Sequence, residues 1–367
     1  MKNKGILGGI FTMVLILVLV LAMGSISVSA EEPTIIASGD CGKDGSDVIW
    51  TLDSTGLLTI SGEGEMTYPI PWISWRDNIK CVVIENGVTS IAERAFSQCT
   101  RLTSVTIPRG VISIGESAFQ GCTGLISLTL PDSVASMGKS AFYGCTGLTE
   151  IYYNAKAVEN LSWSDIVFWN AGISSEGLRV IIGDSVERIP AGLFYRCTSL
   201  ISVDVPNSVT SVEEYAFYGC TGLTSVTIPD RVTSIGKSAF YGCTGLTEVY
   251  YNAREAEDLQ YGVFRNAGIS SGGCQVIIGD SVERIPSNLF NSCTGLAGVT
   301  VGSGATSIGD GAFKSCTGMT SLTIGSNVTS IGNSAFSGCT GLTEIIYNAR
   351  KVSDLDQSTN AFYDAGA

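Results

Sequence analysis

Phenylalanine recurs through this chain every 23 to 26 residues, and this period constrains the fold more than any other feature. The repeat phenylalanines stand at positions 96, 119, 142, 168, 194, 217, 240, 264, 290, 313, 336 and 362. The sequence around them repeats as well, as in SIGESAFQGCTGL at 113–125 and SIGKSAFYGCTGL at 234–246. A fixed period of this length is typical of proteins whose units stack on one another. We therefore expect about twelve stacked coils.

A single unit indicates how each coil folds. In the unit that ends at Phe119, residues 105–107 (Val-Thr-Ile) alternate between apolar and polar and are followed by Pro108. This alternation predicts a short strand, and proline lacks the N–H that would continue its ladder. A second extended piece at 111–114 and one helical or 3₁₀ turn at 116–121 complete the coil. Because each unit has a single apolar edge, the sequence predicts an α/β repeat solenoid with parallel strands on one face.

A longer repeat is superimposed on the short one. Three matching segments, GCTGLTEIYYNA at 144–155, GCTGLTEVYYNA at 242–253 and GCTGLTEIIYNA at 338–349, indicate a duplicated block of four coils. The 26-residue coils contain up to three extra residues. We place these in loops away from the strand, where insertions are tolerated.

The repeat motif resembles that of a known family. The pattern C-x-x-L-x-x-V-x-I-P-x-x-V-x-x-I-G-x-x-A-F, found at 99–119, resembles the leucine-rich repeats of BspA-like, or treponemal-type, bacterial surface proteins. The segment before the repeats, with Cys41-Gly42, Trp50-Thr51-Leu52 and Pro71-Trp72, resembles the cap that precedes such repeats. The resemblance implies a secreted or cell-surface protein of the adhesin or ligand-binding kind, without catalytic residues.

The first thirty residues predict a secretory signal peptide. Lys2 and Lys4 precede an apolar stretch at 6–23, and Val28-Ser29-Ala30 provides small residues at the cleavage positions. An uncleaved membrane anchor is the alternative. We expect a signal peptide at 1–30, an N-terminal β cap at 31–80, and repeats at 81–367 with an open or truncated C-terminal end. The predicted localisation is secreted or at the cell surface.

The composition excludes several classes of function. The chain contains no histidine, which removes Ser-His-Asp and Cys-His catalysis and histidine-ligated zinc. Its 21 basic and 34 acidic residues give a net charge of 21 − 34 = −13, which argues against a nucleic-acid partner. Pairs of carboxylates could still hydrolyse glycans. However, Asp132, Asp184, Asp230 and Asp280 each follow a strand in a turn, where aspartate bonds the turn backbone. We expect neither an enzyme nor a metal or cofactor site.

Nine cysteines each stand three residues after a repeat phenylalanine. They are Cys99, Cys122, Cys145, Cys197, Cys220, Cys243, Cys293, Cys316 and Cys339. Stacked coils place equivalent Cβ atoms about 4.8 Å apart and parallel, whereas a disulfide needs Cβ atoms about 3.8 Å apart and aimed at each other. We therefore expect a structural ladder of buried thiols. Cys41 and Cys81 lie outside the ladder. They either form a disulfide bridge with each other or remain two free thiols.

The outward face of the strands is the candidate binding surface. One residue of each strand must point out between two inward residues, which predicts the column Val83, Thr106, Thr129, Tyr152, Ile181, Asp204, Thr227, Tyr250, Ile277, Thr300, Thr323 and Ile346. Alternation places Glu150 and Asn154 on the same face as Tyr152, and Glu248 and Asn252 on the same face as Tyr250. Exposed tyrosines beside polar groups are typical of contact sites. The alternative is that these residues are simply good strand formers.

Two classes of function follow from this surface. The first is a non-catalytic binding or adhesion module for an extracellular protein or glycan, with membrane contact only through an uncleaved N-terminal segment. The second is a structural spacer that presents a further C-terminal domain. A carboxylate-dependent, glycan-active solenoid is a third, weaker alternative.

Overall fold

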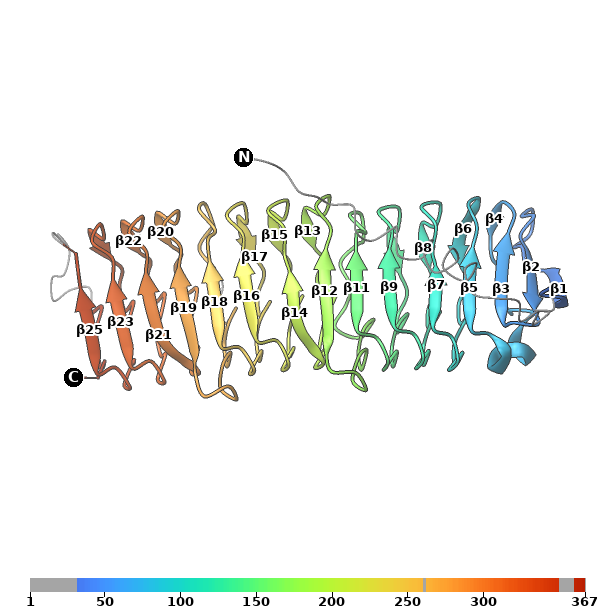
Figure 1. Ribbon diagram of the computed structural model, residues 1–367. Coiled ribbons are helices and arrows are strands. Elements are labelled where there is room, and N and C mark those ends of the chain that lie inside the picture. Colours follow the sequence, from blue (N-terminus) through green and yellow to red (C-terminus); the bar gives the residue numbers. More distant parts are fainter. Residues whose placement is uncertain (1–31, 260–261, 350–359, 367) are drawn as a thin grey trace, which may run out of the picture. The chain divides into compact units, whose positions relative to one another are not determined.

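The structure is a computed structural model and describes residues 32–259, 262–349 and 360–366. The signal peptide predicted at 1–30 lies outside these residues. Residues Ile35–Ala367 form one compact unit, in which the strands of successive coils lie side by side in a row (Figure 1). The prediction of a leucine-rich-repeat solenoid with parallel strands is confirmed, with about 13 turns. Within the described ranges, no helix is long and apolar enough to cross a membrane.

The long strands of the coils form a row, which we call the main sheet. Its strands are β1 (Ile35–Asp40), β2 (Ile49–Asp53), β3 (Leu57–Ser61), β5 (Cys81–Ile84), β7 (Ser104–Thr106), β9 (Ser127–Leu130), β11 (Glu150–Tyr153), β12 (Leu178–Ile182), β14 (Leu200–Asp204), β16 (Ser225–Ile228), β18 (Glu248–Tyr251), β19 (Cys274–Ile278), β21 (Leu296–Val301), β23 (Ser321–Ile324) and β25 (Glu344–Tyr347). The row consists of three hydrogen-bonded sheets, with breaks between β7 and β9 and between β14 and β16. β1, β2 and β3 pair antiparallel, and β3 then pairs parallel with β5. The cap therefore continues directly into the sheet of the repeats.

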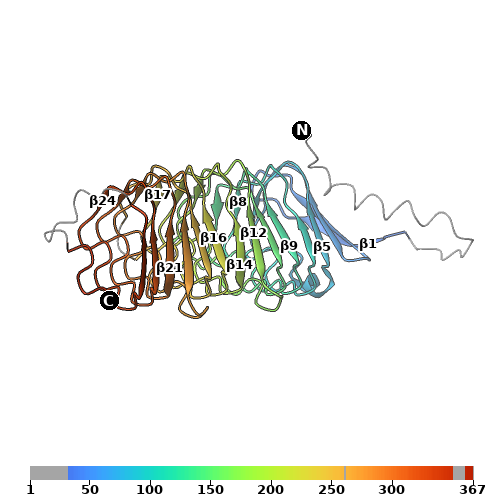
Figure 2. The same cartoon turned by 60° about the vertical axis from the view of Figure 1, so that its left-hand side comes forward.

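Short strands form a second row on another side of the coils (Figure 2). They are β4 (Gly64–Glu65), β6 (Val88–Ile91), β8 (Ser113–Ile114), β10 (Ser136–Met137), β13 (Arg188–Ile189), β15 (Ser211–Val212), β17 (Ser234–Ile235), β20 (Arg284–Ile285), β22 (Ser307–Ile308) and β24 (Ser330–Ile331). The expected second extended piece at 111–114 is confirmed by β8. In the described parts of the coils that contain β11 and β18, irregular loops replace the short strand, so the longer coils differ there and not in the main sheet.

The turn that contains the repeat phenylalanine differs from the helical or 3₁₀ turn expected at 116–121. Alternate N–H groups of this turn donate to the next coil: Phe96 N bonds Ala118 O at 2.7 Å, and Gln98 N bonds Gln120 O at 2.7 Å. Because these donors are used between coils, they cannot form a helical ladder within one coil. The one helix in the described residues is the 3₁₀ helix η1 (Ile73–Asn78) in the cap.

The repeat phenylalanines stack in a continuous column through the core. Successive rings from Phe96 to Phe362 have centroids 4.9–5.6 Å apart. Sequence analysis missed one further ring. Trp72 of the cap stacks on Phe96 at 5.8 Å, and its Nε1 donates to Ala95 O at 2.7 Å. The indole thus extends the column into the cap while its polar N–H is satisfied.

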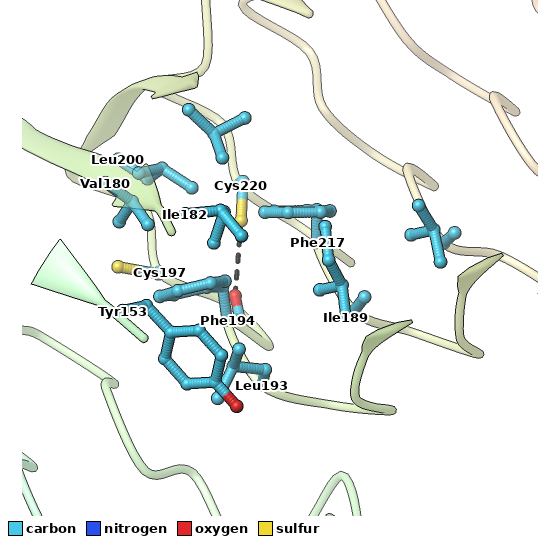
Figure 3. Packing of buried hydrophobic residues seen from close by; sticks show 14 of the residues in the cluster. Tyr153, Val180, Ile182, Ile189, Leu193, Phe194, Cys197, Leu200, Phe217 and Cys220 are labelled. Carbon is cyan, nitrogen blue, oxygen red and sulfur yellow. Dashed lines mark hydrogen bonds between the residues drawn. The ribbon is translucent and has the colours of Figure 1, made fainter. Parts of the chain in front are cut away.

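The nine ladder cysteines lie beside this column and are buried and unbridged. Cys220 donates from Sγ to the carbonyl of Phe194 at 3.2 Å, as Figure 3 shows among the packed side chains. The same bond recurs at 3.1–3.2 Å for Cys122, Cys145, Cys243, Cys316 and Cys339. Each of these thiols thus bonds the carbonyl of the preceding coil's phenylalanine. Cys41 and Cys81 are free as well.

Candidate binding face

The strand register places the two candidate tyrosines in the expected outward column. Tyr152 of β11 lies between Thr129 of β9 and Ile181 of β12, and Tyr250 has an equivalent position in β18. Because side chains alternate along a strand, the residues on either side of Tyr152 point inward and are fully buried. The tyrosines themselves are 40% and 36% exposed. The predicted register of the column is therefore confirmed at both strands.

Each tyrosine forms a pair with the glutamate two residues before it. Tyr250 donates from its hydroxyl to Glu248 Oε2 at 3.0 Å. The hydroxyl of Tyr152 likewise forms a hydrogen bond with the carboxylate of Glu150, and this bond raises the pKa of Tyr152 above its ordinary value. The hydrogen bond to Glu248 likewise raises the pKa of Tyr250. Each pair therefore presents a neutral phenol held in a fixed orientation beside a carboxylate.

The two pairs have different neighbours on the next strand. Arg179 of β12 lies opposite Glu150, whereas Gln275 of β19 lies opposite Glu248. Arg179 is exposed, so the first pair combines an acid, a phenol and a guanidinium on one patch. The second pair lacks this positive charge. The duplicated sites therefore share their geometry but differ in local charge.

Asn154 and Asn252 have a different setting from the tyrosines. Both follow the last residue of their strand and are half-buried. If Gly183 carried a Cβ atom, the atom would lie 2.1 Å from the Oδ1 of Asn154. A Cβ atom on Gly279 would lie 2.1 Å from the Oδ1 of Asn252. Each asparagine therefore fills the space above a glycine of the next coil. The groups that project from the strand face are the tyrosines and glutamates.

Four strand steps separate the two pairs. From β11 the row of strands continues through β12 to β14, where one hydrogen-bonded sheet ends, and then through β16, where the next sheet begins, to β18. With about 4.8 Å between neighbouring strands, the tyrosines are roughly 19 Å apart along one face. In the third block, β25 has Ile346 at the tyrosine position. The described main sheet thus has two Tyr–Glu pairs related by the duplication.

Two of the turn aspartates, Asp280 and Asp230, bond groups of the next coil rather than the expected backbone of their own turn. Asp280 accepts from the N–H of Ser303 at 2.7 Å and from its hydroxyl at 2.9 Å, and these bonds hold the pKa of Asp280 below its usual value. A general acid needs a raised carboxyl pKa instead. Asp230 pairs with Arg254 at 3.6 Å. Among the described residues, no group of three or more cysteine or acidic side chains is arranged to hold a metal ion.

Comparison with known proteins identifies the repeat. The model of the BspA type leucine-rich repeat region matches residues 74–176, 164–273 and 274–365. The chain belongs to this family. The BspA-type match spans almost all of the described coils, which agrees with the resemblance found in the motif at 99–119. No curated protein matches the chain.

Several solved structures are similar to this BspA-type chain. A leucine-rich cell surface protein from Faecalibacterium prausnitzii is 27% identical, with 90% of this chain and 99% of that chain covered and a TM-score of 0.40. A leucine-rich repeat protein from Bacteroides ovatus is 25% identical, with 90% and 91% covered and a TM-score of 0.47. One from Eubacterium ventriosum is 23% identical, with 89% and 99% covered and a TM-score of 0.41.

Sequence analysis missed a second set of aromatic side chains on the BspA-type coils. In five successive coils, the residue directly after the repeat phenylalanine is aromatic: Tyr143, Trp169, Tyr195, Tyr218 and Tyr241. The signal is visible in an alignment of the repeats, where other coils have Ser97, Gln120 or Lys314 at this position. Period-two alternation does not mark these residues, because they lie in the turns and not in the strands.

Proposed function

We propose that this BspA-type leucine-rich repeat protein is a secreted or surface-exposed, non-catalytic binding module for an extracellular protein or glycan. The observation that carries the proposal is the duplicated Tyr–Glu pair on the outward face of the main sheet. A tyrosine offers a large contact area with few rotatable bonds, and its glutamate already fixes its orientation. The sequence at 1–30 supports export of the chain.

The duplication supports adhesion in particular. Two pairs on the same face of one stacked array can engage a repetitive ligand at the same time, so the second contact forms at a high effective concentration. Weak single contacts then give firm attachment. A non-catalytic role is supported by a repeat family that is generally non-catalytic and by the lowered pKa of Asp280, which does not suit a general acid.

Attachment of single and double variants to a panel of matrix proteins and glycans tests the proposal. We expect Tyr152→Ala and Tyr250→Ala each to weaken attachment by about threefold to tenfold, and the double variant to weaken it by more than the two effects together. Ile181→Ala, in the same column, is the matched control. Both tyrosine side chains are exposed, so the melting temperature should change little.

Full retention of binding by the double variant would remove the tyrosine face from consideration. If the unmodified protein bound nothing on a broad panel, the spacer function would be favoured instead.

A further inference from the structure

The aromatic residues that follow the repeat phenylalanines form a second surface, which we call the aromatic stripe: Tyr143, Trp169, Tyr195, Tyr218 and Tyr241. The phenylalanine before each of them points into the core, so the stripe residue points the other way and is half-buried. Hydrogen bonds between coils keep the stripe in register, since Arg196 N donates to Tyr218 O at 2.7 Å and Gly219 N donates to Tyr241 O at 2.7 Å. The stripe is carried by the turns and is separate from the Tyr–Glu pairs of the main sheet.

The rings of the stripe repeat at the spacing of the coils. Tyr195 and Tyr218 stack with centroids 5.0 Å apart, and Tyr218 and Tyr241 stack at 4.9 Å with an angle of only 2° between their planes. Tyr143 and Trp169 meet edge to face at 6.0 Å and 76°. Stacked tyrosines cover each other's faces, so their ring edges and hydroxyl groups are what they present to a ligand. The stripe is thus a row of four phenol groups and one indole, with one ring per coil.

Bare backbone lies beside the rings at both ends of the stripe. Gly144 follows Tyr143 and Gly242 follows Tyr241, with φ of +69° and +71°. A Cβ on either glycine would come no nearer than 3.8 Å to the neighbouring coil. Glycine is therefore favoured here by the backbone conformation and not by lack of space. Gly219 follows Tyr218 in the same way, whereas Asn170 and Arg196 stand at this position in the other two coils, so bare backbone lies beside three of the five rings.

The stripe is uncharged, although the chain as a whole is strongly acidic. None of its five residues carries a carboxylate, and the guanidinium of Arg196 lies 6.0 Å from the centre of the Tyr195 ring. Burial, together with the neighbouring Tyr241 and Tyr195, raises the pKa of Tyr218. The hydroxyl of Tyr218 therefore stays protonated at physiological pH and can both donate and accept hydrogen bonds.

We propose that the aromatic stripe binds an extended, β-1,4-linked glycan that lies along the row of coils. Such a glycan advances by about one strand spacing per sugar, so each coil would meet one sugar. An extended peptide advances about 3.3 Å per residue and does not match a repeat of about 4.8 Å. The phenol groups bond the sugar hydroxyls, and the glycines beside three of the rings leave room for the pyranose rings. No charge on the ligand is required.

Binding of cellohexaose and of the hexasaccharide of β-1,4-linked N-acetylglucosamine, measured by calorimetry on the full chain, tests this proposal. We expect binding of at least one of them, and about a tenfold loss of affinity in Tyr218→Ala and in Tyr241→Ala. Tyr218→Phe keeps the stacked ring but removes the hydroxyl, and it should lose less. Tyr363→Ala is the matched control, because Tyr363 follows Phe362 at the same turn position outside the stripe and should leave affinity unchanged.

Three results would overturn the proposal: no binding of either hexasaccharide, equal binding of the α-1,4-linked maltohexaose, or unchanged affinity in folded Tyr218→Ala and Tyr241→Ala. Thermal melting shows whether each variant is folded. The double variant Tyr152→Ala/Tyr250→Ala separates this site from the main-sheet face. If only that variant lost glycan binding, the stripe proposal would be wrong while the proposed function of the sheet would stand.

Discussion

Phe217 shows what one residue contributes to the stacked core. Its ring is fully buried between Phe194 at 5.5 Å and Phe240 at 5.1 Å. The coils above and below are fixed by their own hydrogen bonds, so they cannot close the cavity that a smaller side chain leaves. We expect Phe217→Ala to lower the free energy of unfolding by about 3–5 kcal/mol. Urea unfolding measures this loss, and a change below about 1 kcal/mol would contradict the column as the main source of stability.

Ile166 occupies a backbone position that disfavours its side chain. Its φ is +42°, while the equivalent residue in the preceding coil, Ser140, has φ of +57°. A β-branched residue in this region is strained, whereas asparagine tolerates it. We expect Ile166→Asn to stabilise the protein by about 1 kcal/mol, seen as a higher melting temperature. Ser334→Asn, at a half-buried and unbranched position of the same turn column with φ of +54°, should change little. A lower melting temperature for Ile166→Asn would show that the side chain's packing outweighs the strain.

At the scale of the element, the strands were predictable and the turns were not. Period-two alternation fixes which residues of a strand point outward, and insertions fall in loops, so the columns that contain Tyr152 and Tyr250 followed from sequence alone. The turn conformation depends on bonds such as Phe96 N to Ala118 O, which join residues 22 positions apart. No local pattern encodes such a partner. Trp72 was missed for a related reason, because the cap lacks the repeat motif that marks the other rings.

The cysteine ladder gives a prediction about pH. Burial raises the pKa of Cys243 to about 12, above the value of about 8.5 for an unfolded thiol. The unfolded chain therefore loses its thiol proton at a lower pH than the folded chain, so stability is full below about pH 8.5 and falls as the pH rises towards 12. We expect the melting temperature to drop between pH 8 and pH 10, with a smaller drop in Cys243→Ala.

Alkylation of the thiols provides an independent measurement. At pH 8.5 the nine ladder thiols should resist iodoacetamide in the folded protein and react after denaturation, because each is buried in the folded coils. Mass spectrometry that found most of the nine in disulfide pairs would contradict both the ladder and the parallel stacking on which it rests.

On the scale of the whole compact unit from 35 to 367, stability should be distributed along the row of coils. In the array the strands contact those of the coils directly beside them, so the unit's stability approximates a sum over neighbouring interfaces. Damage in one coil should then open that coil and its neighbours while distant coils stay folded. Loops replace the short strands in the coils of β11 and β18, so the second row of strands is interrupted there. Local unfolding of the coils should stop at these interruptions.

Hydrogen exchange of Phe217→Ala tests this arrangement. We expect amide protection to fall at about residues 200–245 and to persist at both ends of the unit, because the hydrogen bonds from Phe194 N to Ala216 O and from Phe217 N to Ala239 O join only adjacent coils. Phe96→Ala is the matched control, since it removes an equivalent ring next to the cap and should expose that end instead. An equal loss of protection along the whole unit in both variants would mean that the coils unfold together, and a purely neighbour-based description would then be wrong.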